Sequence, residues 1–274
     1  MGRGLILPGL AIALAAPALG QSDELGFHDT PYLPGGVWRV HDADRPQPQP
    51  VSPGLAPGAP PSDAIVLFDG HSLDGWRSPY RAWEVRDGVL TIPPRAPDAP
   101  ENALETRRGF GDIQLHLEFR TPNPPQNHSQ ERGNSGIWLM QRYEVQILDS
   151  YHNPTFADGV SGALFGWKPP LVNPSRKPGE WQSVDLVFER PHFATDGSLQ
   201  RPAYVTVLLN GVLVQNHQAI LGTVAYRKVG AYKAHGDTAP LRLQDHGFPV
   251  SFRNIWVRPL PPDAIAQDSI GGRP

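Results

Sequence analysis

Residues 133–149 read GNSGIWLMQRYEVQILD, and this stretch decides the fold prediction. Its last part, YEVQIL at 143–148, alternates between apolar and polar residues, which is the pattern of a β-strand. Such a strand sends its apolar residues to one face and Glu144 and Gln146 to the other. We therefore expect the apolar face to cover a core. The face with Glu144 and Gln146 is expected to look onto a wet groove, where a β-sandwich could hold a polar ligand such as a sugar.

The chain after about residue 62 continues as short strands separated by turn residues. A hairpin is expected at 83–92 with Asp87-Gly88 at its tip, and Asn210-Gly211 predicts a second tight hairpin turn. Further strands are expected at 113–120, 184–188, 204–209, 212–214, 241–243 and 250–257. No ten-residue stretch has a helical period after the N-terminal segment. The pattern predicts an all-β sandwich or jelly roll in one domain.

Composition excludes several classes of function. The 274 residues carry a formal net charge of -3 and no basic run, which argues against nucleic acid as a partner. With 28 Gly and 32 Pro against 2 Met, turns and strands are favoured over long helices. There is no cysteine, so disulfides, thiolate zinc sites and cysteine nucleophiles are excluded.

The N-terminus has the features of a secretory signal peptide. Arg3 is followed by an apolar, alanine-rich run at 5–19 and by Ala18-Leu19-Gly20, a small-x-small cleavage pattern. The run is shorter than the roughly 20 residues that a spanning helix needs. We expect cleavage after Gly20, export to the periplasm or the exterior, and no transmembrane segment afterwards; an uncleaved membrane anchor is the alternative.

Four segments are expected along the chain. Residues 1–20 form the signal peptide, and residues 21–61 form a proline-rich tail or linker that tends towards extended geometry. Tyr32 and Trp38 leave docking of residues 27–40 onto the domain as an alternative. Residues 62–260 form the jelly roll, and residues 261–274 form a C-terminal tail.

Polar residues around this central stretch supply the candidate binding groups. Arg132 and Asn134 lie in the loop 132–136 at the start of this stretch and offer donors for hydroxyl or carbonyl oxygens. Asp149 follows the strand, and Trp138 could stack on a sugar ring. The alternative is that the loop is an ordinary turn and the strand an ordinary half-solvated one. Ser135 lacks the strand–Gly-x-Ser-x-Gly–helix setting of a nucleophile elbow.

Two histidines are further candidates. His246 precedes a glycine at a strand end and could act as an acid or base or orient a ligand. His235 is a weaker candidate on a loop. A divalent metal held by Glu144, Asp149 and a histidine is left open, because the spacing does not demand one.

Together these motifs resemble the 3-keto-disaccharide hydrolase domain family. The matching text covers about residues 62–260 in the family's order: LFDGHSLDGW at 67–76, WEV at 83–85, DGVL at 87–90, GNSGI at 133–137, YEVQILD at 143–149, PGEW at 178–181, LNG at 209–211, LQDHG at 243–247 and FRNI at 252–255. The resemblance implies a concanavalin-like jelly-roll sandwich of two antiparallel sheets. It also implies activity on glycosides whose glucose is oxidised to a ketone at C3.

One departure from related folds bears on the chemistry. Retaining glucanases of this shape carry acidic residues at alternating positions of a strand, whereas this chain has Glu144, Gln146 and Leu148. A keto sugar needs no such pair, because a C3 ketone acidifies the C2 proton and a single base can start an elimination at C1. On this hypothesis Glu144 is the base or a metal ligand, and His246 is an acid/base or an oxyanion donor.

The remaining assignments follow from this chemistry. Arg132, Asn134 and Gln146 are expected to contact a carbohydrate substrate; Asp149, Trp138 and His235 complete the expected set. The alternative function is a non-catalytic carbohydrate-binding module of the same shape, and the third is a scaffold. Glu144 paired with His246 across a cleft favours an enzyme; an aromatic platform without a carboxylate favours a binding module.

Overall fold

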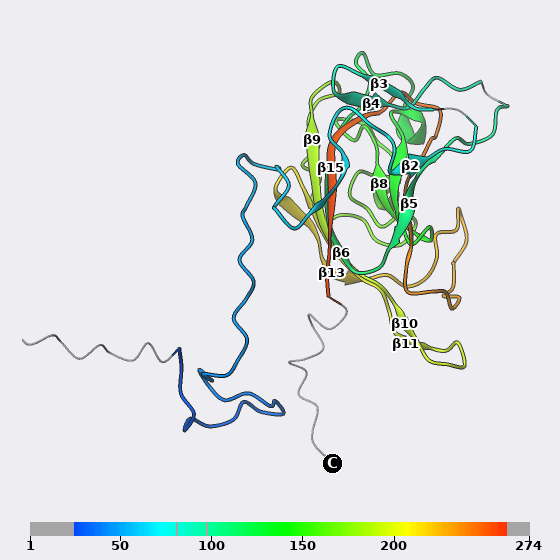
Figure 1. The fold of residues 1–274 in the computed structure, drawn as a ribbon. Helices are drawn as coiled ribbons and strands as arrows, with labels where there is room; N and C mark the ends of the chain where they lie inside the picture. Colours follow the sequence, from blue (N-terminus) through cyan, green and yellow to red (C-terminus); the bar gives the residue numbers. More distant parts are fainter. Residues whose placement is uncertain (1–24, 81, 97, 262–274) are drawn as a thin grey trace, which may run out of the picture. The chain divides into compact units, whose positions relative to one another are not determined.

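The computed structural model describes residues 25–80, 82–96 and 98–261. This part of the chain divides into two units, residues 25–49 and residues 50–261. The larger unit is a sandwich of antiparallel sheets (Figure 1), and no α-helix occurs among the described residues. The expected all-β jelly roll is therefore confirmed.

Two sheets make up the sandwich, and every strand pair in them is antiparallel. The eight-stranded sheet has the order β13 (Val212–Ala219), β12 (Tyr204–Leu209), β9 (Gln182–Glu189), β6 (Ile113–Arg120), β15 (Ser251–Pro259), β4 (Val89–Thr91) and β3 (Glu84–Arg86), with β1 (Ile65–Phe68) also on β15. The five-stranded sheet has the order β2 (Trp76–Arg77), β5 (Leu104–Phe110), β14 (Ala239–Leu243), β7 (Ser135–Leu139) and β8 (Tyr143–Ile147).

The remaining elements are short. Strands β10 (His192–Phe193) and β11 (Leu199–Arg201) form a separate two-stranded sheet. Two 3-10 turns, η1 (Ser129–Glu131) and η2 (Ala157–Gly159), lie in the connections on either side of β7 and β8.

Both hairpin tips predicted from the sequence are present. Asp87 and Gly88 have φ angles of 51° and 77° between β3 and β4, and Asn210 and Gly211 have φ angles of 55° and 76° between β12 and β13. Positive φ at both central residues is what a tight hairpin turn requires, and Asn, Asp and Gly adopt it most readily.

The turn between β7 and β8 is formed by residue types that are not typical of tight turns. Met140 and Gln141 have φ angles of 54° and 56°, and Arg142 N donates a hydrogen bond to Leu139 O at 3.0 Å. Non-glycine residues rarely adopt such angles. This turn fixes the register that pairs β7 with β8, on which the geometry of the candidate site depends.

Apolar side chains from both sheets form one core. Leu115, Leu117 and Phe119 of β6 are fully buried, as are Ile137 of β7 and Ile147 of β8. The alternation read from the sequence therefore directs these residues inward, as a two-layer sandwich requires.

The outer face of β6 is less exposed than a half-buried strand would be. His116 is 2 % exposed because Gly58, in the proline-rich segment, lies against its ring. Gly58 O accepts hydrogen bonds from Asn254 Nδ2 at 2.9 Å and from Trp256 Nε1 at 2.8 Å. This part of the expected linker is thus packed on the sheet, and the compact unit starts at Pro50.

Residues 25–49 are held together by backbone contacts of their own. Phe27 pairs with Asp42 and Tyr32 pairs with Arg39 as isolated bridges. The guanidinium of Arg39 also lies 4.0 Å from the centroid of the Tyr32 ring.

The expected signal peptide at 1–20 and all but the first residue of the expected C-terminal tail at 261–274 lie outside the described residues. Within the described part of the chain, no helix has the length and apolar character needed to cross a bilayer.

Candidate functional site

The outer face of the five-stranded sheet gathers polar side chains in two rows. Trp138 of β7 pairs with Glu144 of β8 on one side and with Arg242 of β14 on the other. These three residues are called the first row. In the second row, Gly136 pairs with Gln146, and Gly136 O accepts a hydrogen bond from Gln244 N at 3.0 Å. Residues two positions apart share a face of a strand, so both rows face away from the core.

Glu144 is directed outward as the alternation predicts. The expectation that this face of β8 looks onto a wet groove is wrong. Glu144 is only 5 % exposed and Gln146 only 2 %. Residues 163–165 also pair with the outer edge of β8: Gln146 N donates to Ala163 O at 2.9 Å, and Phe165 N donates to Glu144 O at 3.2 Å. The strand is therefore covered along its edge as well as on its core face.

The carboxyl group of Glu144 lies over Gly136. A Cβ atom added to Gly136 would come within 2.2 Å of Glu144 Oε1, so only glycine leaves room for the carboxyl group in this position. The second glycine of the GNSG motif therefore serves the site directly, by making space for an acidic side chain on the neighbouring strand.

Burial changes the acidity of Glu144. It raises the pKa of Glu144 to about 8, because the charged form loses its hydration. The indole N–H of Trp138 and the charge of Arg242 lower this pKa, while the charge of Glu101 raises it. A carboxyl group with a pKa near neutrality is suited to exchange a proton with a substrate.

Gln146 and Asn134 belong to a hydrogen-bonded chain. Gln146 Nε2 donates to Asn134 Oδ1 at 3.0 Å, and Asn134 Nδ2 donates to Gln130 O at 2.8 Å. Asn134 is 4 % exposed, so both amides are buried and mutually oriented. The structure thus brings together Glu144, Gln146, Asn134 and Trp138 from the predicted set.

Arg132 and Asp149 form a buried ion pair instead of presenting free groups. Arg132 Nε donates to Asp149 Oδ2 at 2.7 Å, and Arg132 also donates to Tyr151 O at 3.2 Å. Asp149 is 1 % exposed. Burial raises the pKa of Asp149, and the Arg132 guanidinium opposes this effect. The geometry gives this pair a role in holding the two loops that flank β7 and β8.

Three buried polar atoms in the two rows have no hydrogen-bond partner among the described residues. They are Trp138 Nε1, Arg242 Nε and Gln244 Oε1. Trp138 Nε1 nevertheless acts on the Glu144 carboxyl group, whose pKa it lowers, so Arg242 Nε and Gln244 Oε1 are the two atoms left for a ligand. A buried donor or acceptor without a partner costs about 1–3 kcal/mol, so such atoms call for an explanation. Their presence beside a carboxyl group with a raised pKa indicates a site that a ligand completes.

Sequence reasoning missed Arg242, Gln244 and Glu101. Arg242 Nη2 lies 2.5 Å from Glu101 Oε1, and its guanidinium carbon lies 5.1 Å from the centroid of the Trp138 ring. The alternation of Arg242 in β14 and Gln244 just after it was a usable signal for an outward face. The sequence around β14, however, did not predict that this strand would pair with β7.

The two predicted histidines lie in different places. His246 is exposed on the loop after β14, where its ring stacks on Phe248 with centroids 5.8 Å apart. Among the described residues no hydrogen bond or ion pair joins His246 to Glu144. Asp245 holds this loop, since its Oδ1 accepts from Gly247 N at 2.8 Å and its Oδ2 from Asn102 N at 3.1 Å.

His235 lies against the core side of β8. Its Nε2 is 2.9 Å from the hydroxyl of Tyr143, a core residue, and its ring contacts Phe193. Burial lowers the pKa of His235. Because Tyr143 and Glu144 project from opposite faces of β8, the structure does not bring His235 to the two rows.

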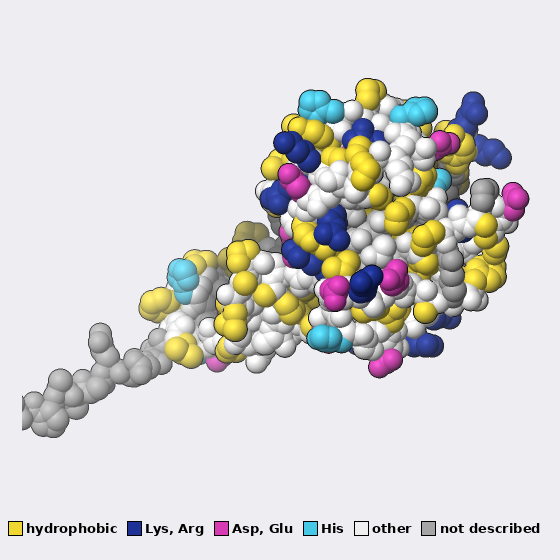
Figure 2. Space-filling model, turned by 90° about the horizontal axis from the view of Figure 1, so that it is seen from above, with side chains coloured by type: hydrophobic (Ala, Val, Ile, Leu, Met, Phe, Trp, Pro, Cys, Tyr) yellow, Lys and Arg dark blue, Asp and Glu magenta, His cyan; other side chains and the backbone are white. Residues whose placement is uncertain are grey.

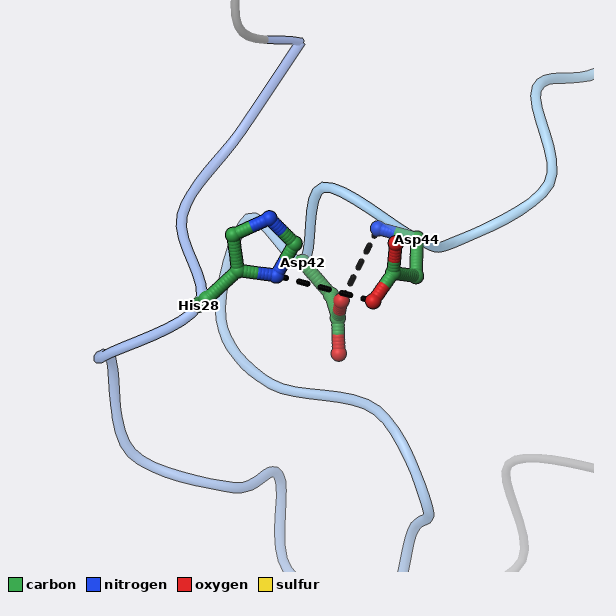
Figure 3. A group of neighbouring side chains, drawn as sticks. All are labelled: His28, Asp42 and Asp44. Carbon is green, nitrogen blue, oxygen red and sulfur yellow. Dashed lines mark hydrogen bonds and ion pairs between the residues drawn. The ribbon is translucent and has the colours of Figure 1, made fainter.

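The metal arrangement left open by the sequence is not formed by the described residues. The group of metal-ligating side chains found there is His28, Asp42 and Asp44 in the unit 25–49 (Figure 3). Asp42 already accepts hydrogen bonds from Arg39 N at 2.9 Å and Asp44 N at 3.0 Å, and these lower its pKa. This group is a turn closed by its own backbone.

The distribution of charged side chains on the surface agrees with the near-neutral net charge of the chain. On the face drawn in Figure 2, Lys and Arg side chains are scattered among acidic and hydrophobic ones.

Comparison with known proteins identifies the family to which the chain belongs. A family model described as a 3-keto-alpha-glucoside-1,2-lyase-like domain matches residues 63–258. A solved structure described as a "putative glycosyl hydrolase" from Parabacteroides distasonis is 42% identical, with a TM-score of 0.74, over 81% of this chain and 97% of that one. A second structure with the same description and organism is 19% identical, with a TM-score of 0.50, over 72% of this chain and 94% of that one; it shows the fold alone. No curated protein matches.

Proposed function

Because the chain belongs to the 3-keto-alpha-glucoside-1,2-lyase-like domain family, we propose that it cleaves glycosides whose glucose carries a ketone at C3. The observation that carries this proposal is the first row of the five-stranded sheet. It combines one buried carboxyl group, Glu144, with the unpartnered Nε–H donor of Arg242.

The proposed reaction begins with proton removal from C2. The Glu144 carboxylate takes the proton, and the electron pair of the C2–H bond forms a C2–C3 double bond while the carbonyl pair moves to the C3 oxygen. A pKa of about 8 makes Glu144 a stronger base than an exposed carboxylate, which a carbon acid requires. A positioned base of this kind contributes roughly 10²–10⁴-fold to the rate.

The enolate oxygen needs hydrogen-bond donors in a water-poor setting. Arg242 Nε–H is a buried donor without a partner, and Arg242 also brings a positive charge. We assign this donor to the C3 oxygen, where the free N–H group would be satisfied as negative charge develops. His246 lies on the loop that follows Arg242 and Gln244. We expect it to contact the sugar on the same side as Arg242.

Elimination completes the step. The enolate pair returns to form the C3 carbonyl, the C2–C3 electrons form a C1–C2 double bond, and the C1–O bond breaks. The departing oxygen keeps its electron pair and takes a proton from water. Addition of water to the unsaturated product would give net hydrolysis. A single carboxylate is enough for this route, in agreement with Gln146 at the position where a second carboxylate would be expected.

The test is to incubate purified protein with 3-keto-trehalose and with trehalose, with and without a chelator. Release of glucose from the oxidised sugar alone is the expected result. Glu144→Gln should lower turnover by at least about 10²-fold while the circular dichroism spectrum is retained. Glu84→Gln, an exposed carboxylate on β3, is the matched control. Cleavage of trehalose itself, or full activity of the Glu144 variant, would contradict the proposal.

We also propose that the protein acts after export, on the basis of the signal-peptide pattern at residues 1–20. N-terminal sequencing of the secreted product should find Gln21 first. Retention of Met1 in the mature protein would count against this.

A further inference from the structure

A cavity of about 520 Å³ lies between residues 156–166 and residues 225–229. Its walls include the rings of Phe156, Phe165 and Tyr226 together with the charged groups of Asp158, Arg227 and Lys228. Glu144 is not among the lining residues, so this cavity is distinct from the position of the proposed base.

One wall of the cavity is attached to the edge of β8, and the other is attached to the residue just before β8. In the first wall, Phe165 N donates to Glu144 O at 3.2 Å. In the second, Val224 N, one residue before the cavity, donates to Arg142 O at 2.9 Å. β8 is the outermost strand of its sheet. The cavity therefore begins where the first row ends, on the side of Glu144 away from Arg242.

A second connection runs through the buried amides. Gln130 Nε2 donates to Gly159 O in η2 at 2.9 Å, while Gln130 O accepts from Asn134, which in turn binds Gln146. The backbone of the wall is thus held in register with the second row of the site.

The lining chemistry points to one class of occupant. Phe156 and Phe165 meet edge to face, with centroids 6.0 Å apart at 67°. Phe156 is 42 % exposed and Tyr226 67 % exposed, so their ring surfaces are open to a further ring. Arg227 and Lys228 add two positive charges against the single carboxylate of Asp158.

We propose that this cavity binds the leaving group of the substrate, and that this group is a phenol. The inference rests on the proposed function, in which Glu144 takes the C2 proton and C3 faces Arg242, so that C1 and its leaving group lie on the side away from Arg242. A phenol has a pKa near 10, as in tyrosine, so it departs as an anion far more readily than a sugar alcohol. Its ring packs on the aromatic walls, and Arg227 and Lys228 meet the charge that develops on its oxygen.

The test compares phenyl and methyl 3-keto-α-glucosides in the wild type and in Tyr226→Ala. The ratio of the two kcat/KM values is compared between proteins, so that intrinsic leaving-group ability cancels. We expect kcat/KM for the phenyl substrate to fall about 3- to 10-fold, and that for the methyl substrate to stay within about twofold. Tyr32→Ala, which removes a similarly exposed tyrosine (59 %) in the unit 25–49, should change neither. Equal losses for both substrates, or none, would overturn the inference.

Two further measurements separate this inference from the proposed function. Calorimetric titration with unoxidised phenyl α-glucoside should show weaker binding to Tyr226→Ala than to the wild type, whether or not any 3-keto substrate is cleaved. Absence of that difference overturns the cavity assignment even if cleavage occurs. With 3-keto-trehalose as a third substrate, a larger loss than with the phenyl compound would assign the cavity to a sugar and also overturn it.

Discussion

Trp138 on β7 lies directly opposite Glu144 on β8, and its indole N–H lowers the pKa of the carboxyl group that burial raises to about 8. The two effects oppose each other on one side chain. Their balance decides the pH at which Glu144 becomes a base.

Replacing Trp138 by Phe should make Glu144 a weaker acid. The substitution keeps an aromatic ring but removes the N–H group that favours the carboxylate. If Glu144 is the base, kcat/KM rises with pH up to about 8 in the wild type. The variant should show the same limb displaced to higher pH. The pH profile is measured with one substrate across the full pH range. An unchanged limb would show that Trp138 does not affect the ionisation of Glu144.

Glu144 should also make the fold less stable as pH rises. Its folded pKa of about 8 lies above the ordinary value of 4.5, so between these values the folded state holds a proton that the unfolded state has lost. The free energy of unfolding therefore falls with increasing pH in this window, by at most about 1.4 kcal/mol per pH unit for one proton. Urea unfolding at several pH values should show a flatter dependence in Glu144→Gln. Comparing the two proteins removes the contribution of Asp149, whose pKa burial also raises. Identical slopes would refute the assignment.

Arg242→Lys should reduce kcat far more than it changes KM. Lysine keeps a positive charge on β14 but lacks the Nε–H donor that is buried without a partner. Loss of one oxyanion donor typically costs about 10²-fold in kcat. Steady-state kinetics on a 3-keto glucoside would check this. A change confined to KM would make Arg242 a ground-state binding residue.

Arg132→Leu should destabilise the protein by about 3 kcal/mol, because it leaves the Asp149 carboxylate buried without its partner. Urea denaturation gives the value. The pair Arg258 and Asp63, with side chains 35% and 36% exposed, is the comparison, and Arg258→Leu should cost at most about 1 kcal/mol. Equal costs at the two sites would show that burial of the first pair is not decisive.

Gly58→Ala should loosen the proline-rich segment from the eight-stranded sheet. Gly58 has a φ of 78°, and an added Cβ would lie 2.9 Å from the His116 ring. Asp185 at 2.6 Å and the stacked ring of Trp256 hold that ring in place. Gly211→Ala has a similar φ of 76° with open space around it, so it measures backbone strain alone. We expect the larger fall in thermal stability for Gly58→Ala; the reverse order would contradict this packing.

Alternation along the strands predicted the sandwich and much of the site. A period of two residues determines which side chains share a face, so Glu144 and Gln146 could be placed opposite the core from the sequence alone. The Asp87-Gly88 and Asn210-Gly211 turns were equally readable, because their residue types favour positive φ.

Other features of the site depend on neighbours that are distant in the sequence. Arg242 and Gln244 join Trp138 and Gly136 only because β14 pairs with β7, across about a hundred residues of chain. The exposure of Glu144 was also misjudged, since its carboxyl group lies over Gly136 of the neighbouring strand, where no pattern along the chain reveals the available space.

The amino-acid sequence by itself thus determined the strands, their inward faces and the outward direction of Glu144, because these follow from local stereochemistry. Only the tertiary structure decided that this carboxyl group is buried beside Trp138 and Arg242 with a raised pKa, while His235 turns to the core side and His246 lies on an exposed loop. The physical reason is that desolvation and pairing energies depend on which strands become neighbours, and that choice is made by the packing of the whole sandwich.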